Sequence, residues 1–177
     1  MARVLKVGLA GCGSVAQRGL IPHLAQPDLK DRIEFRAVMD PVEGRAKATA
    51  EQYLLPLWYE RYEEMLDKAD LDVVVLASPI GYHFEQGMQA VQAGKHVHFN
   101  KTMTTTKAEA DELIAAAAAK GVKLVASPGQ MQRALYQEAK RLLQTGAIGM
   151  LYHCICGRSW IGHEYEGFRE GESVTAN

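Results

Sequence analysis

Short apolar runs alternate with longer segments of helical periodicity along most of the chain. The apolar runs cover residues 4–10, 33–39, 71–77, 96–99 and 122–126. The run at 71–77 (LDVVVLA) is continuous and rich in β-branched residues, which is typical of a strand buried on both faces of a sheet. Strands that alternate with helices predict βαβ units, and therefore a doubly wound parallel sheet of the α/β class.

The segments between these runs carry helix signals. Thr106 stands three residues before Glu109, which is the spacing of a capping box. The helix that begins there is predicted to end at Gly121. Its apolar residues fall on one predicted face, which contains Ala110, Leu113, Ile114, Ala117 and Ala118. Similar patterns predict helices over 82–93 and 133–145.

The composition changes this picture little, because it is close to the average of globular proteins. Apolar residues make up 47% and charged residues 23%, and the formal net charge is −1. A nucleic-acid-binding protein would show a basic excess, and a membrane helix would need an apolar run of about 18 residues. Three cysteines are too few for a disulfide framework. We therefore expect a cytoplasmic protein without nucleic-acid or membrane partners.

A glycine-rich loop follows the first predicted strand directly. Its sequence, GCGSVA over residues 11–16, fits the pattern G-x-G-x-x-G/A. In that pattern the first glycine permits a tight turn, the second lets the backbone approach a pyrophosphate, and the third small residue lets the helix pack on the strand. Gly11, Gly13 and Ala16 take these places. The alternative is an ordinary βα turn that binds no ligand.

The second predicted strand ends at Asp40, where a carboxylate can accept hydrogen bonds from the adenosine ribose and repel a 2′-phosphate. This predicts NAD as the cofactor, although Arg45 could offset the charge and admit NADP. An Asp before Pro41 also suits a helix cap, and both roles can hold together. The span from the glycine loop to Asp40 is longer than usual, which we attribute to a polar loop at 26–32.

Three further segments carry a resemblance to a known family: Ala77-Ser78-Pro79 with His83, then Ala93-Gly94-Lys95-His96-Val97, and then Asn100-Lys101-Thr102. With the glycine loop they resemble the Gfo/Idh/MocA oxidoreductases, the glucose–fructose oxidoreductase and inositol dehydrogenase group, over residues 3–157. The resemblance implies a Rossmann NAD(P)-binding domain at 1–127. It also implies the incomplete beginning of a C-terminal α/β substrate domain at 128–177, where a strand is predicted at 150–156.

The resemblance also assigns residues to the site. Lys101 matches the lysine of the family's Glu-Lys-Pro motif, beside the nicotinamide and the substrate, and His83 matches a histidine that opens the next helix. We predict both as catalytic, with Lys101 as the base that removes the hydroxyl proton. The cofactor-binding residues that we expect are Gly11, Gly13, Ser14, Val15, Ala16, Asp40, Arg45, Ser78, Pro79, Asn100 and Lys101.

The sequence departs from the family pattern at several of these places. The family's Glu is Asn100 here, its Pro is Thr102, and the Asn after its Thr-Pro turn is Ile80. The family often has a cis bond before that proline, so its loss is expected to reshape the turn that aims Lys101. The family's catalytic Asp and His of the second domain would lie beyond residue 177, so we expect that this chain is a fragment or the product of a truncated gene.

These matches imply an NAD(P)-dependent oxidoreductase, homo-oligomeric when full length, that moves a hydride between the nicotinamide and a sugar-like or polyol substrate. Two alternatives stay open. One is a nucleotide-binding regulator or sensor of the same fold without turnover, and the other is an NAD-dependent glycosidase. An Asp-x-x-x-His sequence downstream would favour the oxidoreductase.

The remaining candidates have structural interpretations. His96 and His98 share one face of a predicted strand, but they make only half of a zinc site, so no metal is predicted. Cys12 lies at a helix N-terminus, which could lower its pKa, yet no partner for nucleophilic catalysis accompanies it. The aromatic residues interpreted as packing for the third crossover are Trp58, Tyr59 and Tyr62.

Overall fold

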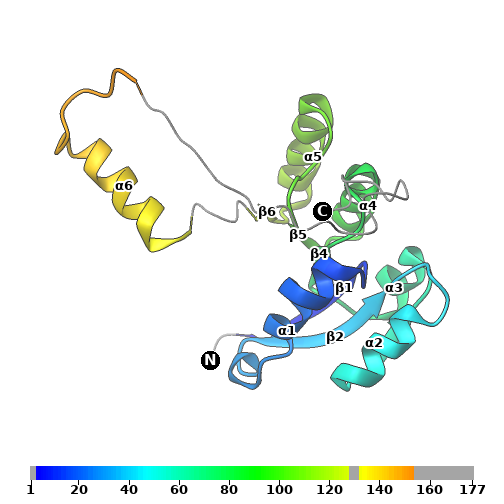
Figure 1. Cartoon of the computed structure of the whole chain (residues 1–177). Coiled ribbons are helices and arrows are strands. Elements are labelled where there is room, and N and C mark those ends of the chain that lie inside the picture. Colours follow the sequence, from blue (N-terminus) through cyan, green and yellow to red (C-terminus); the bar gives the residue numbers. More distant parts are fainter. Residues whose placement is uncertain (1–2, 128–131, 154–177) are drawn as a thin grey trace, which may run out of the picture. The chain divides into compact units, whose positions relative to one another are not determined.

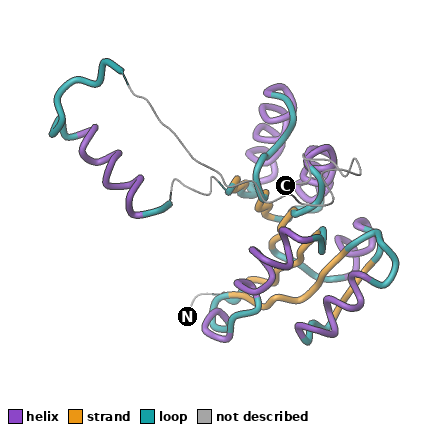
Figure 2. Tube along the Cα trace, viewed as in Figure 1, coloured by secondary structure: helices purple, strands orange, loops and turns teal. Residues whose placement is uncertain are grey.

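The computed structural model describes residues 3–127 and 132–153. The chain divides at Ser127–Pro128 into two compact units, and each is described by itself. The first unit holds a sheet of six parallel strands in the order β3-β2-β1-β4-β5-β6 (Figures 1 and 2). This is the strand order of a Rossmann fold. The predicted doubly wound parallel α/β class is confirmed.

The strands follow the apolar runs of the sequence closely. Their bounds are β1 (Leu5–Ala10), β2 (Ile33–Met39), β3 (Leu57–Tyr59), β4 (Val73–Leu76), β5 (His96–Phe99) and β6 (Leu124–Ala126). The bounds of β2 and β5 agree with the prediction residue for residue. β3 is not among the predicted strands, because three residues at the edge of a sheet, with Trp58 43% exposed, do not form an apolar run.

Helices cover both faces of the sheet. α1 (Ile21–Leu24), which continues a π-helical turn at Ala16–Leu20, and α2 (Arg45–Tyr53) pack on one face. The opposite face carries α3 (Tyr62–Lys68), α4 (His83–Gln92) and α5 (Lys107–Lys120) (Figure 1). Short 3-10 turns lie at Pro27–Leu29 and Ile80–Tyr82. The first of these belongs to the predicted polar loop at 26–32, which is mostly exposed.

Each face of the sheet has its own hydrophobic core, and β4 contributes to both. Val74 and Leu76 join the core under α3, α4 and α5, whereas Val75 joins the core under α1 and α2. Successive side chains of a strand point to opposite faces, so a strand covered on both sides needs apolar residues throughout. This explains why the run at 71–77 identifies a central strand.

The start of α5 agrees with the prediction. Thr106 and Glu109 form the capping box, each accepting from the other's backbone N–H. The predicted apolar face of this helix is partly wrong, because Leu113 and Ala117 are buried but Ile114 is 52% exposed. α5 packs beside α4, and only the stripe that faces α4 and the sheet is covered.

In the second unit, the described residues contain one helix, α6 (Ala134–Gln144), inside the predicted range 133–145. The strand predicted at 150–156 is absent over residues 150–153, and the rest of it lies outside the described residues. A strand needs a neighbour for its backbone hydrogen bonds. The described part of this unit provides no second strand for such pairing.

Candidate functional site

The loops that carry most predicted site residues meet at the carboxyl-end edge of the sheet. There the first loop residue donates a backbone hydrogen bond to the last carbonyl of the neighbouring strand: Gly11 to Met39 (2.8 Å), Ala77 to Ala10 (2.8 Å) and Asn100 to Leu76 (2.9 Å). These bonds place the loops after β2, β1, β4 and β5 side by side. This edge includes the point between β1 and β4 where the strand order reverses, which is where open α/β sheets bind ligands.

Gly11 and Gly13 are glycines for different reasons. Gly11 has a φ of +95°, and an added Cβ would lie 2.7 Å from the carbonyl carbon of Ala77, so only glycine fits this turn. An added Cβ at Gly13 would meet nothing within 4 Å. The space beside Gly13 is therefore open to a ligand, while Ala16 is fully buried where the helix packs.

The helix after the glycine loop begins next to this open space. Its first intrahelical hydrogen bond runs from the Gln17 N–H to the Gly13 carbonyl, at 3.0 Å. The N–H groups of Ser14, Val15 and Ala16 precede that bond, so they project from the helix N-terminus, where the helix dipole attracts anions. This cradle fits the pyrophosphate of a dinucleotide.

Asp40 is joined to the glycine loop by its own carboxylate. Its side chain is only 4% exposed. Oδ2 accepts the Cys12 N–H at 2.8 Å, and Oδ1 accepts the Val42 N–H at 3.0 Å. The Arg45 Nη1 lies 3.4 Å from Oδ1. The helix-cap interpretation of Asp40 is wrong, because its carboxylate caps the turn at Val42, whereas α2 begins at Arg45 after Gly44 without a side-chain cap hydrogen bond. The contact of Asp40 with a ribose stays a prediction.

The turn after β4 packs against Gly11 and is anchored by side-chain hydrogen bonds that involve α4 and α3. Ser78 is 9% exposed, and its hydroxyl donates to the Gln86 Oε1 on α4 at 2.5 Å. The Gln86 carbonyl in turn accepts the Tyr62 hydroxyl from α3 at 2.9 Å. The packing role predicted for Tyr62 is confirmed. Pro79 follows at the exposed side of the turn.

The loop after β5 carries the lysine of the candidate site. Asn100 is half-buried, whereas Lys101 and Thr102 are exposed. The peptide bond between Lys101 and Thr102 is cis, as the resemblance implies for the bond before the family's proline. The expectation that threonine reshapes the turn stays a prediction.

His83 lies beneath these two loops, not at the open edge. It is 1% exposed, and both ring nitrogens lie near backbone carbonyls: Nδ1 is 2.6 Å from the Thr102 oxygen and Nε2 is 2.9 Å from the Ser78 oxygen. No ring nitrogen is left for a substrate proton in this arrangement. Gln86, which the sequence prediction missed, follows three residues later on the same side of α4, and that helical spacing is the signal that could have found it.

A family model described as "Oxidoreductase family, NAD-binding Rossmann fold", the Gfo/Idh/MocA family, matches residues 5–127. The chain belongs to this family. The resemblance drawn from the sequence motifs is thereby confirmed. The matched region is the unit that carries the glycine loop, Asp40 and Lys101.

The relatives of this Gfo/Idh/MocA chain include enzymes of sugar metabolism. It is 30% identical, over 83% of its own length and 42% of the relative's, to a dTDP-3,4-didehydro-2,6-dideoxy-alpha-D-glucose 3-reductase from Streptomyces violaceoruber. Among solved structures it resembles the WlbA dehydrogenase from Bordetella pertussis in complex with NADH and UDP-GlcNAcA, with a TM-score of 0.73 and 27% identity, covering 81% of this chain and 43% of that one.

A second solved structure is a 3-ketoreductase from Actinomadura kijaniata in complex with TDP-benzene and NADP. The TM-score is 0.74 and the identity 29%, and the match covers 83% of this chain and 45% of that one. The chain therefore spans less than half the length of these relatives. The two solved structures hold different dinucleotides, so family membership alone does not decide between NAD and NADP.

The Cys12 thiol is unsuited to nucleophilic chemistry. It is 2% exposed, and burial raises its pKa to about 12. The suggestion that the helix N-terminus lowers this pKa is wrong, because loss of hydration disfavours the thiolate more strongly. The Sγ lies 3.6 Å from the Met39 carbonyl. Cys12 therefore acts as a packing residue of the glycine loop.

The histidines of β5 do not assemble a metal site in the described residues. The His96 Nδ1 accepts the Lys123 N–H at 3.0 Å, and burial lowers the pKa of His98. Residues 3–127 and 132–153 contain no group of three or more potential metal-binding His, Cys, Asp or Glu side chains. Among the helices of the same residues, none has the length and apolar character needed to cross a membrane.

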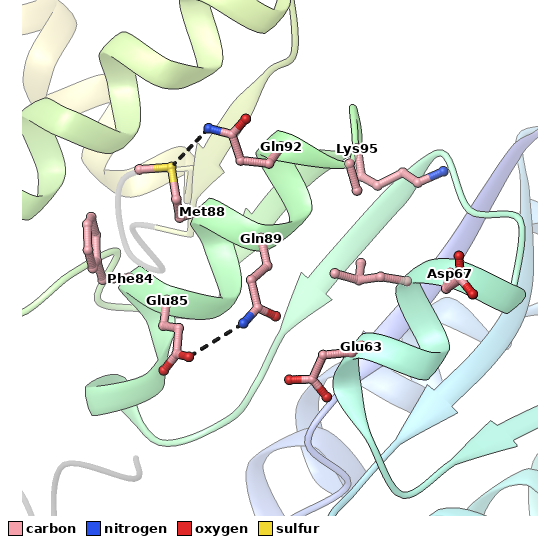
Figure 3. Close-up of a pocket in the computed structure, with 10 residues that line it drawn as sticks. Glu63, Asp67, Phe84, Glu85, Met88, Gln89, Gln92 and Lys95 are labelled. Atoms are coloured by element: carbon pink, nitrogen blue, oxygen red, sulfur yellow. Dashed lines mark hydrogen bonds between the residues drawn. The ribbon is translucent and has the colours of Figure 1, made fainter.

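A groove of about 720 Å³ lies between α3 and α4, away from the glycine loop (Figure 3). Leu66, Phe84 and Met88 supply apolar lining, and the carboxylates of Glu63, Asp67 and Glu85 are among its polar groups. None of the predicted site residues lines this groove. Its lining therefore gives no evidence about the reaction.

Proposed function

We propose that the complete protein is an NAD(P)-dependent oxidoreductase that acts on a carbinol carbon of a sugar-like or polyol substrate. The observation that carries this proposal is the shared edge, where an open phosphate cradle lies in line with the Ser78 turn and the Lys101 loop. Cytoplasmic location and assembly into a homo-oligomer are parts of the same proposal.

Each group at this edge has a defined task. The N–H groups of Ser14, Val15 and Ala16 bind the pyrophosphate, and Asp40 binds the adenosine ribose. A dinucleotide held by these groups would supply hydride transfer to or from the carbinol carbon. Lys101 accepts the hydroxyl proton of the substrate as the carbonyl forms, and it returns a proton in the reverse direction. Ser78, Pro79 and Asn100 line the path between the phosphate cradle and Lys101.

A screen of the complete gene product against sugars, polyols and sugar nucleotides, read by the absorbance of reduced nicotinamide, tests this proposal. Turnover with at least one substrate is expected. Tight dinucleotide binding without turnover on any of them would instead favour a sensor. Release of a sugar without net change in reduced nicotinamide would favour a glycosidase.

Asp40 supports NAD over NADP, because its carboxylate adds a negative charge where a 2′-phosphate would bind. Arg45 offsets part of that charge. We expect Asp40→Ser to weaken NAD binding by about 1–3 kcal/mol, through loss of hydrogen bonds to a charged group. Glu43→Ser, which removes an exposed carboxylate from the same turn, is the matched control and should leave binding unchanged. Equal affinity of the unmodified protein for both dinucleotides in calorimetric titration would contradict the preference.

A further inference from the structure

His83 connects two loops of the edge that belong to different strands. The Ser78 carbonyl follows β4, and the Thr102 carbonyl follows β5 next to Lys101. The imidazole ring lies between them, with heavy-atom distances of 2.9 Å and 2.6 Å. The ring of Phe99, from the end of β5, lies 5.9 Å from the His83 ring between centroids. The ring is therefore enclosed on the side of the core.

Both partners of this ring are hydrogen-bond acceptors. A carbonyl oxygen accepts hydrogen bonds and cannot donate them. The ring nitrogens reach one carbonyl on each side, so the enclosed ring bridges the two loops.

One end of this connection is already anchored. Ser78 donates its hydroxyl to Gln86, and Gln86 accepts from Tyr62, so the turn after β4 is held by α4 and α3. Residues 100–102 of the exposed Lys101 loop have no comparable side-chain hydrogen bond among those found in the described residues, apart from the one that joins His83 to Thr102. Farther along the same loop, Thr105 and Thr106 bond to Glu109 of α5. The side-chain connection between the turn of Lys101 and the Ser78 turn therefore runs through His83.

We propose that His83 is a positioning residue that ties the Lys101–Thr102 loop to the Ser78 turn and so orients the Lys101 amine. The inference rests on the proposed function, because it gives His83 a role through Lys101. It replaces the catalytic role expected from the sequence. His83 neither exchanges a proton with the substrate nor touches it.

Two variants of the complete protein remove the bridge, His83→Gln and His83→Asn. The variant whose free energy of unfolding stays closer to that of the unmodified protein is used for the kinetic measurements.

A double-mutant cycle tests the action through Lys101. Glutamine removes the ring whose two nitrogens reach the two carbonyls on opposite sides, so His83→Gln should lower kcat about tenfold or more while the Kd for NAD stays within a few-fold. In a Lys101→Met background the same change should have no further effect on kcat. Val91→Ala, a buried change elsewhere on α4, is the control for loss of stability and should leave kcat unchanged.

Additive effects of His83→Gln and Lys101→Met on kcat would show a merely structural role and overturn the proposal. An unchanged kcat in Lys101→Met alone would instead contradict the proposed function of the lysine. Because Lys101→Met is also measured by itself, the two failures can be told apart.

Discussion

The two ends of the candidate site are built differently. The phosphate end, residues 11–16 with Asp40, keeps the family pattern and is fixed by the backbone, since Gly11 lies against Ala77 with no room for a Cβ. The lysine end, residues 100–102 with His83, departs from the family at Asn100 and Thr102 and is held by the backbone hydrogen bond from Asn100 to Leu76 and by one buried side chain. The close backbone contact at Gly11 permits only glycine there. A side chain that bonds to the backbone carbonyls of a loop can hold that loop even when the residue types of the loop differ.

The largest effect is expected at the lysine end. Lys101→Met keeps the bulk of the side chain and removes the amine, so turnover of the complete protein should fall about 10²-fold or more, the usual scale for a general acid or base. The Kd for NAD should change little. Lys30→Met, at an exposed lysine in the turn before β2, is the matched control and should keep full activity. Turnover within a few-fold of the unmodified protein would show that another group carries the proton.

At the phosphate end, two glycine substitutions should separate folding from binding. Gly11→Ala should destabilise the fold by about 1–3 kcal/mol, because the new Cβ overlaps the backbone of Ala77 and the residue has positive φ. Gly13→Ala should leave the free energy of unfolding nearly unchanged, since its Cβ meets no atom within 4 Å. It should nevertheless weaken NADH binding about tenfold or more by filling the cradle.

Denaturant unfolding and NADH fluorescence titration measure the two quantities separately. If Gly13→Ala bound NADH as tightly as the unmodified protein does, the pyrophosphate would not approach this residue. The phosphate end would then be an ordinary βα turn.

The smallest effect concerns the thiol inside the glycine loop. With a pKa of about 12 for Cys12 against an ordinary value of 9.0, the thiolate fraction at pH 8 is roughly 10⁻⁴, so alkylation should be far slower in the folded than in the unfolded protein. The folded state keeps its proton where the unfolded chain has lost it. This contribution to stability is therefore fully present below pH 9 and is lost as the pH rises toward 12. Peptide mapping after iodoacetamide treatment measures the rate, and rapid native labelling would show that the loop opens readily.

The order of strands and helices could be predicted from the sequence wherever features of a short segment determine it. The capping box at Thr106 rests on an interaction between residues close in the chain, and the apolar run that became β4 and the glycine loop after β1 are marked by residue types that stand together in the chain. β3 was missed because a short edge strand is stabilised by its neighbour β2, not by its own apolar residues. Exposure of Ile114 was missed because the packing of α5 against α4 selects which stripe is buried.

The sequence by itself determined the family, the fold class and the residue types of the site, because motif spacing and hydrophobic periodicity are written along one chain. The tertiary structure decided which polar groups of the site have hydrogen-bond partners within the protein and which remain open to a ligand. Asp40 and His83 are separated by many residues from the N–H and carbonyl groups that they bind. Only the closure of the parallel sheet brings those partners together, so the carboxylate joins the glycine loop and the imidazole joins the lysine loop.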